Sequence, residues 1–254
     1  MKHLMSPEGE AAMRALIERG GLLGFDFDGT LSPTVTLPEN ASMPRSVGRG
    51  FAVLCEAMPV AVITGRSVAD ITPRLATMPK YLVGNHGAEG LPGQDAALLT
   101  RYQEICTDWM QQIEKKLRLQ EIDPGLMIEH KPYSICLHYR LVRNRHTTIQ
   151  KVEDALPRLS PMPLIIGGKC GINLLPPGAP HKRQALEDLL ALEGMRSAFF
   201  VGDDETDEVV FRAAPPEWVT VRVERVRDSA ARFFLHHQSE MAECLKWMIQ
   251  FVKS

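Results

Sequence analysis

The sequence has no long hydrophobic run, no basic block and no closely spaced cysteine pair, and each absence argues against a class of protein. No apolar stretch among the 254 residues approaches the roughly 18 that a membrane-spanning helix requires. Lys and Arg number 29 against 31 Asp and Glu, so we expect neither nucleic acid nor a membrane as partner. The segment from Met1 to Gly20 carries charges where a signal peptide is apolar, which predicts a cytoplasmic chain.

The five cysteines form no Cys-x-x-Cys pair, and with their odd number and apolar neighbours we expect reduced, buried thiols. They are Cys55, Cys106, Cys136, Cys170 and Cys244. With 44% apolar and 24% charged residues, the composition is that of an ordinary globular protein. The length suffices for a core plus a smaller inserted domain. The oligomeric state stays open, with a monomer as the default expectation.

Short apolar runs alternate with helical segments in most of the chain. The runs, bounded by turn residues and rich in β-branched or aromatic side chains, cover 22–27, 59–64, 81–84 and 198–202. The helical segments cover 7–19, 44–58 and 67–75, start again near Lys182, and close the chain over 240–252. This alternation predicts an α/β fold with a doubly wound parallel sheet.

Residues 94–176 follow another pattern. A long polar helix is expected over 96–120, and strands over 126–131 and 134–140 are separated only by Pro132 and Tyr133. So short a connection makes a hairpin, because parallel strands need a crossover. A helix over 146–159 and strands over 163–168 and 171–175 complete a second α/β unit with its own antiparallel sheet. We therefore expect a core built from 1–93 and 177–254, with 94–176 inserted.

Asp26 and Asp28 stand where the first apolar run ends, followed by Gly29, which allows close backbone approach. One aspartate can attack a phosphoryl group if a divalent cation neutralises the repulsion. A second acid two residues on can protonate the leaving oxygen and then deprotonate water. The same motif also suits calcium loops and plain turns.

Asp203, Asp204 and Asp207 follow another predicted core strand. Clustered carboxylates repel one another unless a cation neutralises them, and oxygen ligands favour a hard cation, magnesium before zinc. An acidic helix start is the alternative, since aspartates suit the helix dipole.

Thr64, Gly65 and Arg66 close the run over 59–64, where a hydroxyl and backbone N–H groups are placed to hold phosphate oxygens. Lys182 would supply a compact cation for the same phosphate, although a surface lysine is the alternative. All four segments lie at strand ends or helix starts on one side of a single predicted sheet. Together they indicate a phosphate site more specifically than any one of them does alone.

The segments DFDGTL, ITGR, a lysine and GDDETDE, in this order with an insertion between the second and third, resemble the haloacid dehalogenase superfamily of aspartate-dependent phosphatases. The resemblance implies that Asp26 is the nucleophile and Asp28 the acid and base, with Thr64 and Lys182 holding phosphate. It also implies a magnesium ion held by Asp26, the Asp28 carbonyl and Asp203, supported by Asp204 and Asp207. The insertion resembles the α/β cap of the subgroup that acts on sugar phosphates.

Further motifs resemble the trehalose-6-phosphate phosphatases: GNHGAE from Gly84, EHK from Glu129, HYR from His138, and Gly168-Lys169. The resemblance implies that Glu129, Lys131 and Arg140 grip the sugar. Charged side chains at hairpin ends suit a polar ligand better than a core. The further sugar-binding candidates are His86, Lys169, Gly171 and Asn173.

Two positions of the insertion depart from this family, which usually has a glutamate and a basic residue where Asn173 and Leu175 stand, and Lys182-Arg183 replaces the usual lysine-glycine but keeps the cation. Asparagine still exchanges hydrogen bonds with hydroxyls but carries no charge. We expect hydrolysis of trehalose 6-phosphate, with sucrose phosphate or mannosylglycerate phosphate as alternative substrates. A phosphomannomutase, a phospho-aspartate receiver domain and a non-catalytic sugar-phosphate-binding partner of a synthase are further alternatives, which the intact set of candidate catalytic residues and the cap motifs disfavour.

Overall fold

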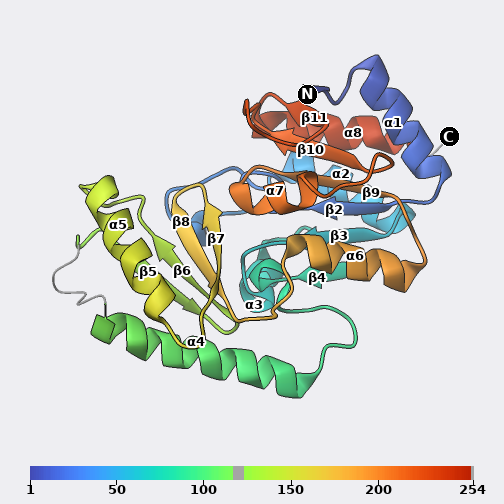
Figure 1. Cartoon of the computed structure of the whole chain (residues 1–254). Coiled ribbons are helices and arrows are strands. Elements are labelled where there is room, and N and C mark those ends of the chain that lie inside the picture. Colours follow the sequence, from blue (N-terminus) through green and yellow to red (C-terminus); the bar gives the residue numbers. More distant parts are fainter. Residues whose placement is uncertain (117–122, 253–254) are drawn as a thin grey trace. The chain divides into compact units, whose positions relative to one another are not determined.

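The computed structural model describes residues 1–116 and 123–252 (Figure 1). The chain divides into two compact units, one made of residues 1–91 and 181–254 and the other of residues 92–180. Each unit has its own sheet and its own hydrophobic core. Among the described residues, no helix combines the length and the apolar character needed to cross a bilayer.

The first unit is built on a seven-stranded sheet with the order β1-β11-β10-β9-β2-β3-β4. Every neighbouring pair in this sheet is parallel. The strands are β1 (Lys2–His3), β2 (Leu22–Phe25), β3 (Val60–Ile63), β4 (Tyr81–Val83), β9 (Ala198–Gly202), β10 (Val219–Val223) and β11 (Phe233–Leu235). The central strands are buried throughout, as expected of a parallel sheet covered on both faces.

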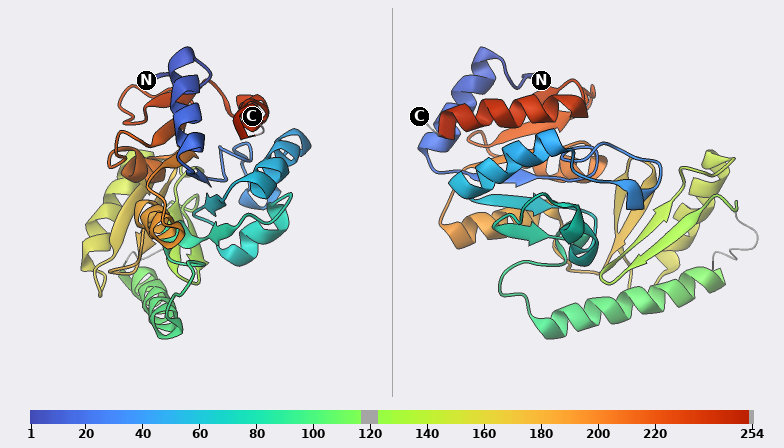
Figure 2. Two further views of the ribbon diagram at one scale, coloured as in Figure 1. Left: turned by 90° about the vertical axis from the view of Figure 1, so that its right-hand side faces the viewer. Right: turned by 180° about the vertical axis from the view of Figure 1, so that it is seen from behind.

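Helices cover both faces of this sheet (Figures 1 and 2). On one face, α1 (Pro7–Glu18), α2 (Arg45–Ala57) and α8 (Met241–Val252) share a core with β2 and β9 that includes Phe25, Phe51 and Phe199. On the other, α6 (Lys182–Glu193) and α7 (Glu205–Phe211) pack with β3 through residues such as Ile63 and Leu186. The remaining helical segments are α3 (Val68–Ile71), η1 (Pro38–Asn40), η2 (Thr72–Arg74), η3 (Asn85–Gly87) and η6 (Gln238–Glu240).

Local sequence signals set the ends of these helices. Ser6 caps α1, its side chain accepting a hydrogen bond from the Gly9 N–H, and Pro7 takes the first helical position, as the sequence predicts. Gly194 ends α6 in the left-handed region at φ 66°. The helix expected over 67–75 is instead the short α3 followed by η2, because Pro73 lacks the N–H that would continue the α-helical pattern.

The second unit has an antiparallel sheet with the order β5-β6-β8-β7. Its elements are α4 (Ala96–Lys116), β5 (Met127–Lys131), β6 (Ser134–His138), α5 (Arg145–Ala155), η5 (Leu156–Arg158), β7 (Leu164–Gly168) and β8 (Gly171–Leu175). Residues 117–120 of the expected helix over 96–120 lie outside the described residues. The fold class expected from the sequence, a doubly wound parallel core with a smaller cap carrying an antiparallel sheet, is confirmed.

The predicted hairpin is present, with Lys131 opposite Ser134 across the two-residue turn. Strand alternation then gives the sheet two different faces. Ile135 and Leu137 point into a core that includes the fully buried Trp109 of α4. Side chains at alternate positions, such as Glu129 and Cys136, share the opposite face.

The cysteines are all free thiols. Cys106, Cys136 and Cys244 are buried as expected, whereas Cys55 and Cys170 are only half-buried. Burial raises the pKa of Cys106 and Cys244 to about 12, so both are inert protonated thiols at neutral pH.

Candidate active site

Asp26 lies at the carboxyl end of β2 and is only 4% exposed. Its backbone N–H donates to the Val201 carbonyl of β9 at 2.9 Å, so the residue is held between two central strands. Lys182, at the start of α6, donates from Nζ to Asp26 Oδ1 at 2.7 Å and to Asp207 Oδ1 at 2.8 Å. The structure therefore joins two sequence-predicted residues, Asp26 and Lys182, that are remote in the chain, and Lys182 is a buried residue rather than a surface lysine.

Asp203 and Asp207 complete a cluster of three buried carboxylates with Asp26, each offering an oxygen within 4.8 Å of the others. Both follow β9, and Asp207 lies in the first turn of α7. Asp204 has a different role in the described contacts, because its side chain accepts from the Glu205 N–H at 2.8 Å and caps α7. The acidic helix start and the carboxylate cluster, taken as alternatives from the sequence, are both present.

Two glycines let the backbone approach these carboxylates. A Cβ at Gly29, where φ is +75°, would stand 2.1 Å from Asp203 Oδ2. A Cβ at Gly202 would stand 2.2 Å from the Asp207 carboxyl carbon. Any larger side chain at either position would displace the cluster.

The electrostatics of the cluster are set by burial and by its own charges. Burial raises the pKa of Asp26 well above its ordinary value, Lys182 opposes this, and Asp207 and Asp203 raise it further. Burial alone would lower the pKa of Lys182, but Asp207 and Asp26 outweigh burial and raise it. In the contacts described above, three carboxyl groups share the single ammonium of Lys182, so negative charge is in excess within this cluster.

The donor set fits a hard divalent cation. Asp26 and Asp203 offer buried carboxylate oxygens. The Asp28 carbonyl oxygen is a further candidate ligand, because Asp28 lies in the same loop after β2 as Asp26. Oxygen-only ligands favour magnesium over softer transition metals. The excess negative charge gives a physical reason for a cation here.

Arg66 binds Asp28 through two hydrogen bonds, from Nε at 2.7 Å and from Nη2 at 2.8 Å. Its Nη1 donates to Asp70 at 2.5 Å, and Nη2 also reaches the Pro38 carbonyl at 2.8 Å. Burial lowers the pKa of Arg66, but Asp28 and Asp70 more than compensate and raise it. Asp28, the candidate acid and base, is thus paired with Arg66, a candidate phosphate-binding residue.

The loop that carries Thr64 and Gly65 is held by the GNHGAE motif. The His86 N–H donates to the Thr64 carbonyl at 2.9 Å, and a Cβ on Gly65 would stand 2.5 Å from the His86 ring. Glu89 Oε2 accepts from the Val68 N–H at 2.8 Å and from Asn85 Nδ2 at 2.7 Å. This motif therefore braces the candidate phosphate loop from behind.

Sequence reasoning missed three residues that position this site. Asp70 holds Arg66, and its i+4 spacing from Arg66 is a signal that could have revealed it. Glu89 was noted only as part of a motif. Arg222 donates to the Asp204 carbonyl at 2.7 Å from β10, a strand that was not predicted.

The second unit carries a separate polar group on the face of its sheet opposite the hydrophobic core. His138 Nε2 lies 2.8 Å and Lys131 Nζ 3.3 Å from Glu129 Oε2. Burial raises the pKa of Glu129, but His138 and Lys131 outweigh this and lower it to about 2. Cys136 and Glu129 raise the pKa of His138 to about 9.

The other sugar-binding candidates of this unit are more dispersed. Strand register places Asn173 opposite Cys136 and Gly171 opposite His138, on the same face as Glu129. Arg140 and Lys169 are exposed and lie in turns beyond the strand ends. His86 belongs to the first unit.

The fold and the clustered aspartates define the chain as a haloacid dehalogenase-type protein of the class with a cap. Solved structures with this arrangement include one described as a trehalose-6-phosphate phosphatase related protein, with a TM-score of 0.73 at 25% identity, covering 91% of this chain and 97% of that one. Another is the C-terminal domain of trehalose-6-phosphate phosphatase from C. albicans, with a TM-score of 0.73 at 20% identity over 95% of this chain and 96% of that one.

Residues 24–239 match the family model for trehalose-phosphatase. The chain belongs to the trehalose-phosphatase family, a family of phosphoric monoester hydrolases. A trehalose-phosphate phosphatase of Mycobacterium ulcerans is 31% identical over 231 residues, which cover 86% of this chain and 59% of that protein. The chain thus spans about three fifths of the length of this curated relative.

Proposed function

We propose that this protein hydrolyses trehalose 6-phosphate to trehalose and phosphate, with Asp26 as the nucleophile. The observation that carries the proposal is the pairing of Asp26 with Lys182 beside Asp203, in a member of the trehalose-phosphatase family. A buried carboxylate with a lysine and further carboxylates around it suits phosphoryl transfer, where positioning and charge neutralisation supply most of the catalysis.

In the first step, Asp26 attacks the phosphorus atom in line with the departing sugar oxygen, and an aspartyl-phosphate forms. Thr64, the backbone N–H groups around Gly65, and Lys182 hold the phosphate oxygens. Asp28 donates the proton that the sugar oxygen needs, which requires Asp28 to exchange its contact with Arg66 for the substrate. Arg66 is then available for the phosphate.

In the second step, Asp28 takes a proton from a water molecule, which releases phosphate and regenerates Asp26. Magnesium, held by Asp26, Asp203 and the Asp28 carbonyl, would neutralise the charge of the nucleophile and the phosphate. Asp204 and Asp207 keep these ligands in place, Asp207 through Lys182 and through the Asp204 N–H at 3.0 Å.

The sugar specificity is assigned to the second unit. We propose that Glu129, Lys131 and Arg140 bind the sugar hydroxyls, with Asn173 on the same sheet face as Glu129. Lys169 and Gly171 are the further candidates of this unit, and His86 is a candidate sugar-binding residue of the first unit. Because Asn173 is uncharged, another glycosyl phosphate such as sucrose phosphate or mannosylglycerate phosphate is the second candidate substrate.

The mechanism is tested with Asp26→Asn. We expect a loss of phosphate release of at least about a thousandfold, with unchanged circular dichroism, because the amide is not a nucleophile. EDTA should abolish wild-type activity, and added magnesium should restore it. Retained activity in Asp26→Asn would exclude Asp26 as the nucleophile.

The substrate is tested by phosphate release from trehalose 6-phosphate, sucrose 6-phosphate, glucose 6-phosphate and mannosylglycerate phosphate. Strong preference for trehalose 6-phosphate supports the assignment and makes Asn173 a tolerated substitution. Preference for another sugar phosphate would leave the proposed mechanism of the first unit unchanged but would replace trehalose 6-phosphate as the proposed substrate. If none releases phosphate, the non-catalytic alternative holds.

A further inference from the structure

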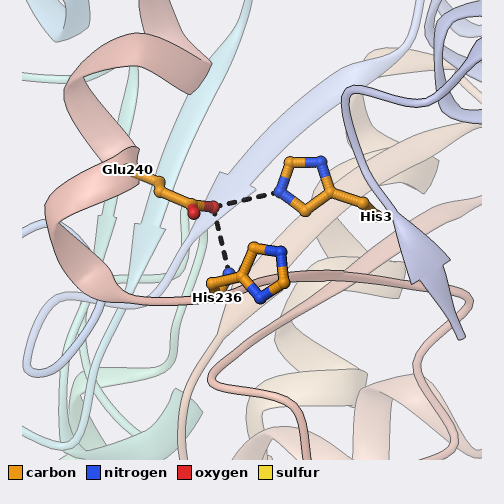
Figure 3. A group of neighbouring side chains, drawn as sticks. All are labelled: His3, His236 and Glu240. Atoms are coloured by element: carbon orange, nitrogen blue, oxygen red, sulfur yellow. Dashed lines mark hydrogen bonds and ion pairs between the residues drawn. The ribbon is translucent and has the colours of Figure 1, made fainter.

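Outside the aspartate cluster, two histidines and a glutamate meet at the edge of the parallel sheet (Figure 3). His3 ends β1, His236 directly follows β11, and Glu240 is the last residue of η6, immediately before α8. Each offers one donor atom, and these atoms all lie within 4.8 Å of one another. Three elements from opposite ends of the sequence thus bring metal-ligating side chains to one place.

The carboxylate of this group is held in position. Glu240 Oε2 lies 3.0 Å from His3 Nε2 and accepts the backbone N–H of His236 at 3.0 Å (Figure 3). The backbone contact fixes the carboxylate through the main chain, so it would persist if an ion took the place of the direct contact between His3 and Glu240.

The two imidazole rings are stacked, with their centres 5.0 Å apart and an interplanar angle of 24°. One nitrogen of each ring lies within 4.8 Å of the other and of a Glu240 oxygen, so a rotation of the side chains could bring all three to one ion. Phe234 packs edge-on against both rings, at 5.5 Å and 5.0 Å, and restrains them.

A purely structural ion pair would need only His3 and Glu240. The His236 ring adds an exposed imidazole whose nitrogens make no hydrogen bond within the part of the chain that the structure describes. Its nitrogen is a potential metal ligand beside those of His3 and Glu240. The His236 ring packs against His3 and Phe234, but an ion at this position would also use its nitrogen, which the His3–Glu240 pair does not.

The donor types decide which ion would bind. Two imidazole nitrogens and one carboxylate oxygen suit zinc and similar transition metals, whereas magnesium prefers the all-oxygen set around Asp26. Three protein ligands leave at least one position for water or another ligand. We propose that His3, His236 and Glu240 form a second metal site, selective for zinc-like ions, which links strand β1 to the start of helix α8.

The test uses the untagged full chain in saturating magnesium, which occupies the aspartate cluster. Zinc is titrated into the wild type, His236→Ala and the matched control His237→Ala, and bound zinc is measured by equilibrium dialysis and elemental analysis. His236 and His237 are adjacent exposed residues, so neither substitution should disturb folding. We expect one bound zinc in the wild type and in His237→Ala, and at least tenfold weaker binding in His236→Ala.

Thermal unfolding gives a second readout. Micromolar zinc should raise the midpoint of the wild type and of His237→Ala, because a ligand that binds only the folded state stabilises it, and this shift should be lost in His236→Ala and Glu240→Gln. Equal zinc binding by the wild type and His236→Ala, or no binding to the wild type at micromolar zinc, would overturn the proposal. The same variants should retain phosphatase activity in magnesium, which separates this test from that of the proposed function.

Discussion

Lys182 is a buried ammonium whose two partners are buried carboxylates. We expect Lys182→Met to lower the free energy of unfolding by about 3–5 kcal/mol in the presence of a chelator, because the carboxylates lose their compensating charge. Magnesium should reduce this loss by neutralising the same carboxylates. Urea unfolding with and without magnesium measures both effects.

Lys80 provides the control for that substitution, since its ion pair with Glu193 involves a side chain that is 51% exposed. Lys80→Met should change the free energy of unfolding far less than Lys182→Met, because solvent screens an exposed ion pair. Equal losses in the two variants would show that Lys182 does not balance the buried cluster.

Asp70 holds Arg66 in position for its contact with Asp28. Asp70→Asn removes one charge from this network but keeps a side chain of the same size, so we expect kcat/KM to fall about tenfold. Steady-state kinetics measure the change. Asp188→Asn, at an exposed helical carboxylate bonded to Gln184, serves as the control and should leave kcat/KM unchanged; an unchanged value in Asp70→Asn would argue against a positioning role.

The Glu129–His138 pair predicts a pH dependence of stability. The pKa of His138 is raised to about 9, so its contribution is complete below its ordinary pKa near 6.5 and is lost as pH rises towards 9. The pKa of Glu129 is lowered to about 2, so its contribution is complete above about 4.5 and is lost as pH falls towards 2. Partial exposure should keep the effect below about 1 kcal/mol.

Thermal unfolding of wild type and His138→Gln from pH 5.5 to 9.5 checks this prediction. The difference in midpoint should shrink above pH 6.5. His146→Gln, in α5, is the control. A difference that stays constant across this range would show that protonation of His138 does not stabilise the fold.

At the scale of elements, the GNHGAE segment acts as a brace. Glu89 joins the start of α3 to η3, and η3 contains the non-glycine residues Asn85 and His86 at φ values of 48° and 60°. Glu89→Ala takes the Glu89 acceptor from the half-buried Val68 N–H and the buried Asn85 amide, and we expect a loss of about 1–3 kcal/mol together with a lower kcat/KM. Chemical unfolding and steady-state kinetics test this prediction. The control is Glu56→Ala, at an exposed residue, which should change neither the stability nor kcat/KM. If the two variants behave alike, Glu89 does not hold the loop in place.

The central elements are predictable because their patterns are local. The runs that became β2, β3, β4 and β9 are short, apolar and bounded by turns, and the two-residue gap between β5 and β6 permits only a hairpin. Strand β1 has no such signal, because two residues make no period and its pairing with β11 joins opposite ends of the chain. Strand β10 has β-branched residues but includes the charged Arg222.

In the candidate site, too, some features follow from local sequence patterns and others do not. Its carboxylates are visible in the sequence, since strand ends collect at one edge of a parallel sheet. The contact of Arg66 with Asp28 and the ring of His86 behind Gly65 depend on loop conformations, which no periodicity encodes. The family resemblance identified the residues of the cap hairpin but not the interaction of Glu129 with His138.

At the scale of the whole molecule, the two units have separate hydrophobic cores. We expect Leu137→Ala, in the core of the second unit, to lower its local stability by about 2–5 kcal/mol through cavity formation. Hydrogen exchange followed by mass spectrometry should show faster exchange in β5 to β8, while β2 and β9 keep their protection. Uniformly faster exchange would instead identify a single cooperative unit.

The parallel sheet ends in very short strands on both sides, two residues in β1 and three in β4. A long exposed edge is a template on which another chain can add a strand, and short edges limit this form of aggregation. Neither edge of the parallel sheet should therefore serve as a template for edge-to-edge aggregation.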